Sequence, residues 1–308
     1  MDLVLIYDRF LIADHCAFYA DHCSPENGCR SFLIQLIYAE ASLNVLYFRA
    51  VTVLALYNLK GGVGKTAAAV NLGYLAAEAG YKTLIWDLDP QASASFYLES
   101  KPLAKHQTKK ILGGEIDVRD AVQSSTFKNL WILPADLSAR NVDVLLDDLK
   151  KSRKKLKSLL GDLKEYDVVI LDCPPGISLL HENVFIAAKW IIVPNIPTTL
   201  SIRSYETVLE YFRNNDLDER KVRCFFSMVD HRKSLHHEVM QQFFKENLFF
   251  KSYLPYLSDI EKMGVHRKPL FAYANRSFAA NCYRHLWEEI KNQVWHEADE
   301  KDSAESKI

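Results

Sequence analysis

Short apolar stretches alternate with longer amphipathic segments from Val51 onward. The short stretches are rich in Val, Ile and Leu, which predicts buried strands over 53–57, 83–87, 130–134, 168–172, 190–194 and 222–229, with a shorter one over 250–254. The longer segments predict helices over 65–79, 142–163, 177–188, 202–214, 235–246 and 278–295. This alternation is typical of βαβ units, so we expect an α/β fold: an open, mainly parallel twisted sheet with helices on both faces.

The same pattern divides the chain into three segments. One domain is expected over 51–296, followed by a polar tail over 297–308. Residues 1–50 show no sustained period, and we treat them as an N-terminal extension of uncertain status. Two interpretations of this extension stay open. It is either a small docking segment or an upstream in-frame extension of a shorter protein that starts near Val51.

Composition and charge exclude few functions. With a net charge of -1, the 308-residue chain has no overall attraction to a polyanion, so any such binding requires a local basic patch. Cys16, Cys23 and Cys29 lack the spacing of a zinc finger, which disfavours a zinc site. The cysteine pattern fits a reducing compartment, and no signal peptide, spanning helix or basic amphipathic membrane anchor is evident. We therefore expect a cytoplasmic protein.

A glycine-rich loop between a predicted strand and a predicted helix is the strongest motif. It reads Lys60-Gly61-Gly62-Val63-Gly64-Lys65-Thr66. Glycines allow backbone N–H groups to approach phosphate oxygens, and the start of the following helix adds its positive dipole end. The loop therefore predicts a nucleotide site in which Lys65 contacts the β- and γ-phosphates and Thr66 binds magnesium.

Aspartates follow two of the predicted strands. Asp87 and Asp89 belong to the segment Asp87-Leu88-Asp89-Pro90-Gln91, and Asp172 ends the apolar run over 168–171. Parallel strands place their carboxyl ends at one edge of the sheet, so these carboxylates are expected beside the glycine loop. Magnesium and an attacking water both need oxygen groups at such a position near the γ-phosphate.

The loop sequence resembles the deviant Walker A motif of ParA/MinD ATPases, with Lys60 at the position of their signature lysine. The resemblance extends over 51–295, includes a DxDPQ switch and a Walker B segment, and is closest to ParA-type partition ATPases. It implies that Asp89 orients water, that Asp87 and Asp172 support magnesium with Thr66, and that catalysis rests on Lys60, Lys65 and Asp89. Because no strong general base is evident, turnover is expected to be slow without a partner.

The same resemblance extends the nucleotide site beyond the lysines. It implies that ATP contacts the loop from Lys60 through Thr66 and also Ala67, and that Pro255 borders the adenine. The family usually has a second threonine where this chain has Ala67. The loss of that hydroxyl is worth ~1 kcal/mol, so we expect weaker affinity without loss of the site.

The resemblance also implies a biological role. We expect an ATP-dependent homodimer, with Lys60 acting on the partner's nucleotide, that binds DNA nonspecifically and is stimulated by a ParB-like adaptor. Basic residues for a DNA patch are present at Arg203, Arg223, Arg232, Lys233, Arg267, Lys268 and Arg276, and the predicted helix over 145–163 has a strongly basic face. The alternatives are a MinD-like or other protein-cargo positioning or regulatory ATPase, a metal-cluster carrier, or a metabolic ligase-type P-loop enzyme with a deep substrate pocket.

Overall fold

The computed structural model describes residues 51–136, 142–149 and 152–305. The docking, zinc and in-frame-extension hypotheses for residues 1–50 lie outside the described residues. Among the helices that are described, none is both long and apolar enough to cross a membrane.

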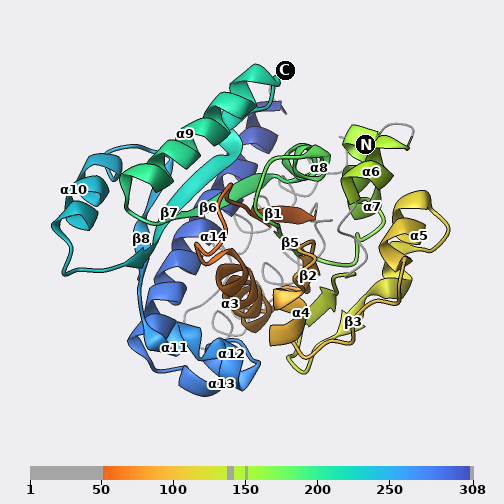
Figure 1. Cartoon of the computed structure of the whole chain (residues 1–308), viewed down its shortest axis with the longest axis horizontal. Coiled ribbons are helices and arrows are strands. Elements are labelled where there is room, and N and C mark those ends of the chain that lie inside the picture. Colours follow the sequence, from red (N-terminus) through yellow and green to blue (C-terminus); the bar gives the residue numbers. More distant parts are fainter. Residues whose placement is uncertain (1–50, 137–141, 150–151, 306–308) are drawn as a thin grey trace, which may run out of the picture. The chain divides into compact units, whose positions relative to one another are not determined.

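A single sheet organises the described part of the chain from residue 51 onward (Figure 1). Its strands are β1 Thr52–Leu56, β2 Thr83–Asp87, β3 Gln123–Ser124, β4 Leu130–Leu133, β5 Val168–Asp172, β6 Trp190–Asn195, β7 Val222–Val229 and β8 Phe249–Pro255. They are arranged in the order β3-β4-β2-β5-β1-β6-β7-β8, and every neighbouring pair except β3–β4 is parallel. The predicted mainly parallel sheet is confirmed.

Helices cover both faces of this sheet. In chain order they are α3 Lys65–Glu78, α4 Ser93–Tyr97, α5 Gln107–Gly113, α6 Val142–Asp147, α7 Lys155–Leu160, α8 Leu179–Ala187, α9 Thr199–Asn214, α10 Ser234–Phe243, α11 Ser258–Glu261, α12 Met263–His266, α13 Phe271–Ala274 and α14 Phe278–Glu305. Short 3₁₀ turns span Val118–Ala121, Ser152–Lys154 and Glu219–Lys221.

The two faces form separate hydrophobic cores because side chains of a strand alternate between them. Val53 and Ala55 of β1 belong to the core under α5 to α10, whereas Leu54 and Leu56 belong to the core under α3, α4 and α14. All five residues of β1 are buried, as expected for a central strand of a parallel sheet. The glycine loop that follows β1 therefore begins from a rigid point.

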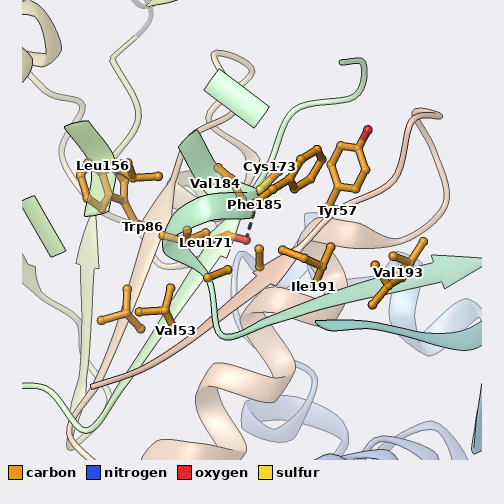
Figure 2. Packing of buried hydrophobic residues seen from close by; sticks show 14 of the residues in the cluster. Val53, Tyr57, Trp86, Leu156, Leu171, Cys173, Val184, Phe185, Ile191 and Val193 are labelled. Atoms are coloured by element: carbon orange, nitrogen blue, oxygen red, sulfur yellow. Dashed lines mark hydrogen bonds between the residues drawn. The ribbon is translucent and has the colours of Figure 1, made fainter. Parts of the chain in front are cut away.

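Aromatic packing secures the first of these cores beside the loop (Figure 2). The ring of Phe185 lies edge-on to Tyr57 at 4.8 Å between centroids and contacts Phe212 at 4.7 Å. Such pairs contribute about 0.5–1.5 kcal/mol beyond burial. Cys173 is fully buried here with its thiol directed to the Leu171 carbonyl, which supports a packing role for this cysteine.

The predicted helix over 142–163 is wrong as a continuous element. The structure places α6 over Val142–Asp147 and α7 over Lys155–Leu160, with a 3₁₀ turn over Ser152–Lys154 between them. Like charges three and four residues apart destabilise a helix, and the sequence between 150 and 157 is almost entirely basic. The sequence did not predict several short elements, namely β3, α4, α5 and α11 to α13. The last helix, α14, continues to Glu305 into the expected polar tail.

Candidate nucleotide site

The glycine loop connects β1 to α3 through two left-handed residues. Gly62 has φ 72° and Gly64 has φ 89°, a region that side chains rarely tolerate. Gly64 is the N-cap of α3 and makes no side-chain cap. The first N–H groups of a helix have no partners within it, so this end of α3 presents donors suited to phosphate oxygens.

Both lysines of the loop have their ammonium groups on backbone carbonyls. Lys65 Nζ donates to the Lys60 carbonyl at 3.0 Å, and Lys60 Nζ donates to the Leu200 carbonyl at 2.6 Å. Burial lowers the pKa of Lys65, and the negative charge of Asp172 acts in the opposite direction. Phosphate oxygens accept stronger, charge-assisted bonds than carbonyls do, so an anion in the loop would compete for both ammonium groups.

Sheet register brings the two strand-end aspartates together. Asp172 of β5 pairs with Asp87 of β2 on one side and with Leu56 of β1 on the other. The Asp87 carboxylate accepts hydrogen bonds from the Ser95 backbone N–H at 2.8 Å and from its hydroxyl at 2.7 Å. Burial raises the pKa of Asp87 to about 6, although these bonds from Ser95 act in the opposite direction.

Asp172 is fully buried, and neither of its carboxylate oxygens has a hydrogen-bond partner that satisfies distance and angle criteria within the described residues. Burial, followed by the nearby charge of Asp87, raises the pKa of Asp172 well above its usual range. The neighbouring Thr66 hydroxyl and Lys65 ammonium act in the opposite direction. An unpartnered buried carboxylate is costly, which points to a cation that completes this site.

The oxygen groups around Asp172 fit magnesium. Thr66, Asp87 and Asp172 offer a hydroxyl and two carboxylates, the ligand type that a hard divalent cation prefers. In the described ranges no group of three or more His, Cys, Asp or Glu side chains forms a ready metal cage. Magnesium is typically held by one or two carboxylates together with substrate phosphates and water, so the sparse protein ligands agree with a cation that binds with its nucleotide.

Asp89 lies on the loop after β2, next to the two buried carboxylates. Its N–H donates to Asp87 at 3.2 Å, and its own carboxylate accepts the Gln91 N–H at 2.9 Å. The Asp89 side chain is only partly buried. It therefore stands at the carboxyl edge of the sheet, where a water molecule has access.

Asn58 and Ser227 were not predicted, although both fix the glycine loop. Asn58 is buried; its side chain accepts the Lys60 N–H at 2.8 Å and donates to the Pro194 carbonyl at 2.8 Å. Ser227 of β7 donates to the Val63 carbonyl at 2.8 Å. An amide directly after a buried strand was the sequence signal for Asn58, whereas the contact with Ser227 depends on strand order.

Ala67 and Pro255, the two other predicted nucleotide contacts, lie on different elements. Ala67 is partly buried in the first turn of α3. Pro255 ends β8 opposite Val229 of β7, at the carboxyl edge of the sheet, but its side chain is buried. The neighbouring Tyr256 is 57% exposed.

The seven basic residues considered for DNA do not form a single patch. Arg223 lies near the start of β7, packed over the Trp190 ring at 4.5 Å, whereas Arg232 follows the end of this strand and is paired with Asp230 at 2.9 Å. Arg223 and Arg232 therefore lie towards opposite edges of the sheet. Exposed positions at Arg267, Lys268 and Arg276 follow one another around α12 and α13.

A small cavity adjoins the aspartates on the other side of the site. It measures about 30 Å³ and is lined mainly by apolar residues, among them Trp86, Leu112 and Leu146, with Asp87 at its wall. This volume holds about one or two water molecules. It is too small for the substrate of a ligase-type enzyme.

Sequence comparisons identify several similar proteins. A family model described as an AAA domain matches residues 51–221. The sporulation initiation inhibitor protein Soj of Bacillus subtilis is 30% identical over 249 residues, which cover 77% of this chain and 97% of Soj. The chromosome-partitioning ATPase Soj of Treponema pallidum is 30% identical over 248 residues, covering 77% of this chain and 96% of that protein.

A solved structure has the same fold. The ATP complex of Cyanothece McdA superposes with a TM-score of 0.68 at 18% identity, covering 78% of this chain and 95% of McdA.

Proposed function

This chain belongs to the ParA/MinD-type family of P-loop ATPases, and we propose that it acts as an ATP-dependent dimerising switch that positions DNA or another cargo. The observation that supports this proposal best is the arrangement at the end of β1. Lys60 and Lys65 of the glycine loop lie near the end of β5, where Asp172 has no hydrogen-bond partner among the described residues. We infer that the nucleotide is Mg-ATP and that its hydrolysis resets the switch.

Within this proposal each group of the loop has one task. Backbone N–H groups of the loop and of the first turn of α3 bind phosphate oxygens, and Lys65 places a positive charge against them. Thr66, Asp87 and Asp172 would hold magnesium, which neutralises phosphate charge when it is bound. Asp89 orients the attacking water from its partly exposed position. Catalysis then rests on positioning and on charge neutralisation.

Lys60 is suited to act outside its own subunit. Its ammonium is directed to the start of α9, where it contacts the Leu200 carbonyl, while Lys65 remains at the centre of the loop. The Leu200 side chain beside this carbonyl is 66% exposed, so this position lies at the protein surface. We propose that ATP draws two copies together over this face, with Lys60 exchanging the carbonyl for the partner's nucleotide.

DNA is the cargo or track that we propose, in line with the chromosome-partitioning relative. The basic residues Lys268 and Arg276 are exposed and close in sequence, and a dimer would present two copies of each. Phosphate contacts of this kind give nonspecific, salt-sensitive affinity. A ParB-like adaptor and a cytoplasmic, nucleoid-associated location belong to the same proposal.

DNA binding by the full chain tests the switch. Binding to nonspecific duplex DNA is measured at several salt concentrations, with magnesium and either ADP or a non-hydrolysable ATP analogue. We compare the native chain with Lys60→Ala and with Lys245→Ala, which removes an exposed lysine outside the site. The proposal predicts salt-sensitive binding with the ATP analogue that is lost in Lys60→Ala and kept in Lys245→Ala.

Two results would redirect the proposal. Binding of equal strength with ADP and with the ATP analogue would mean that nucleotide does not control the DNA contact. No binding in either state, together with intact nucleotide affinity, would indicate a protein cargo in place of DNA.

A further inference from the structure

A groove separate from the glycine loop lies between α4 and α12. It measures about 400 Å³ and is lined by Gln91, Ala92, Ser93, Ser95, Phe96, Tyr97, Ser100, Pro102, Gly264 and Arg267. The volume is within the range of about 300–1,000 Å³ that is usual for binding pockets. None of these residues belongs to the glycine loop or to the proposed magnesium ligands.

The described lining of the groove carries a positive charge and includes no carboxylate. Arg267 is the one formally charged residue of its lining, and its guanidinium lies over the Phe96 ring at 4.4 Å. Within the ranges described, Arg267 makes no ion pair with an acidic side chain. Lys101 and Lys268 are exposed and directly follow the lining residues Ser100 and Arg267. An occupant with carboxylates would therefore be favoured over a basic one.

The groove is also apolar enough to hold an anchoring side chain. Phe96 is 44% exposed, and Val265, the neighbour of the lining residue Gly264, is 80% exposed. Exposed apolar surface with a polar rim is typical of protein interaction sites. Partner segments usually gain most of their affinity from one or two such buried anchors.

Backbone conformation marks the same place. The lining residues Ala92 and Arg267 have φ of 55° and 50°, and Glu99 beside the lining residue Ser100 has φ of 51°. Residues other than glycine rarely adopt this left-handed region. Ala92 is the N-cap of α4 and Arg267 is the C-cap of α12, so α4 begins and α12 ends at this groove.

The groove is connected to the catalytic aspartates through α4. The Ala92 N–H donates to the Asp89 carbonyl at 2.8 Å, and Ser95 holds the Asp87 carboxylate with both its N–H and its hydroxyl. Ala92 and Ser95 both line the groove. An occupant that shifts α4 would therefore shift the residues proposed to orient water and to support magnesium.

We propose that this groove docks an acidic segment of a partner protein, with an apolar anchor between carboxylates, and that docking changes the rate of ATP hydrolysis through α4. The charge of Arg267 and the exposed apolar surface are the observations that support docking of the segment. The effect on hydrolysis rests on the proposed function.

Peptide binding tests the docking site directly. The probe is a fluorescein-labelled peptide in which Glu alternates with Leu or Trp. The control peptide has Lys in place of every Glu. Anisotropy is measured with the full chain, magnesium and a non-hydrolysable ATP analogue. The acidic peptide should bind saturably and at least about tenfold more tightly than the basic one. Arg267→Glu should weaken the affinity for the acidic peptide by at least about tenfold.

Matched variants separate the groove from general charge and folding effects. Lys245→Glu reverses the charge of an exposed residue outside the groove and should leave acidic-peptide binding unchanged. Phe96→Ala should weaken binding by removing the apolar wall. Thermal unfolding and Mg-ATP affinity of each variant should match those of the native chain. In ATPase assays the peptide should change the rate in the native chain and not in Arg267→Glu.

Several outcomes would overturn the docking site. Equal binding of the two peptides, or an unchanged affinity in Arg267→Glu, contradicts it. If Arg267→Glu loses duplex DNA while keeping the acidic peptide, the arginine serves DNA; if it loses ATP-dependent dimerisation, the groove is a face between two copies. If the native chain binds the acidic peptide but does not dimerise with ATP, the docking site is supported. The same result contradicts the proposed dimerising switch.

Discussion

At the scale of single residues, Asp172 is the described acidic side chain of the site whose two carboxylate oxygens are buried without a hydrogen-bond partner. Its carboxylate is fully buried, has no hydrogen-bond partner within the described part of the chain and lies beside Asp87 in register. Without cation and nucleotide, this arrangement destabilises the folded chain, because a buried charge without a partner is costly. The carboxylates that we propose as magnesium ligands are therefore also the groups whose burial destabilises the nucleotide-free protein.

Replacing Asp172 should reveal this conflict. Asp172→Asn removes the charge and should raise the free energy of unfolding of the nucleotide-free chain by roughly 1 to 3 kcal/mol. The same change should abolish the rise in melting temperature that Mg-ATP gives the native chain. Asp120→Asn, at an exposed position, should have neither effect in the same thermal scans. A variant that is less stable without nucleotide and still stabilised by Mg-ATP would contradict this assignment.

Ala92 offers a second residue-scale test. At φ 55° it lies in the left-handed region, so Ala92→Gly should stabilise the chain by about 1 kcal/mol. Ala79, with φ of -72°, is the matched control: Ala79→Gly should be neutral or destabilising by roughly 0.5–1 kcal/mol. Urea unfolding curves measure both. Equal shifts for the two substitutions would show that the conformation of Ala92 carries no strain.

The sequence indicated the residues of the proposed nucleotide site, but it did not indicate the residues that hold the glycine loop from behind. The glycine loop and its two lysines were recognisable because phosphate binding needs consecutive residues with defined backbone freedom. Asn58 and Ser227, which fix that loop, were missed, since their contacts join β1 to β6 and β7. Such contacts depend on the order of strands in the sheet, which spacing along the chain does not determine.

At the scale of elements, α3 is held close to the sheet by the absence of a side chain at Gly73. A Cβ built at this position would lie 2.6 Å from Ile85 Cδ1 and 3.0 Å from Cγ1. Gly73 is buried in the middle of α3, where glycine is otherwise unfavourable. Close approach of α3 to β2 is therefore the reason for the glycine at this position.

Gly73→Ala tests this packing. The substitution should destabilise the chain by about 1–3 kcal/mol through overpacking, despite the better helix propensity of alanine. Ile85→Val removes Cδ1, the atom nearest to the new Cβ. The double variant should therefore lose less unfolding free energy than the sum of the losses in the two single variants. Gly264→Ala in α12, where nothing lies within 4 Å of the new Cβ, is the control and should not destabilise. Additive losses in denaturant unfolding would contradict the contact.

Element prediction failed where local charge opposed a regular pattern. The leucine spacing over 142–163 favours one long helix, but the structure divides it into α6, a 3₁₀ turn and α7. Lysine and arginine side chains at Arg153, Lys154, Lys155 and Lys157 repel one another more strongly in a continuous helix. By contrast, β2, β5 and β7 have the predicted bounds, because buried strands of a parallel sheet are short and uniformly apolar.

At the scale of the whole molecule, the sheet brings residues from distant parts of the chain to one edge. The glycine loop, Asp87 and Asp172 follow β1, β2 and β5, which are neighbours in the order β2-β5-β1. The sequence predicted this convergence because parallel strands share a carboxyl edge. It did not predict the groove between α4 and α12, since neither short helix was recognised from its pattern.

Sedimentation velocity of the full chain tests the proposed switch most directly. Native protein and Lys60→Ala are compared at matched concentration with magnesium and either ADP or a non-hydrolysable ATP analogue. We predict that the native chain shifts from monomer to dimer with the ATP analogue alone and that Lys60→Ala stays monomeric although it keeps its fold. A chain that has the same oligomeric state with both nucleotides, or a Lys60→Ala variant that dimerises as the native chain does, would contradict the proposed switch.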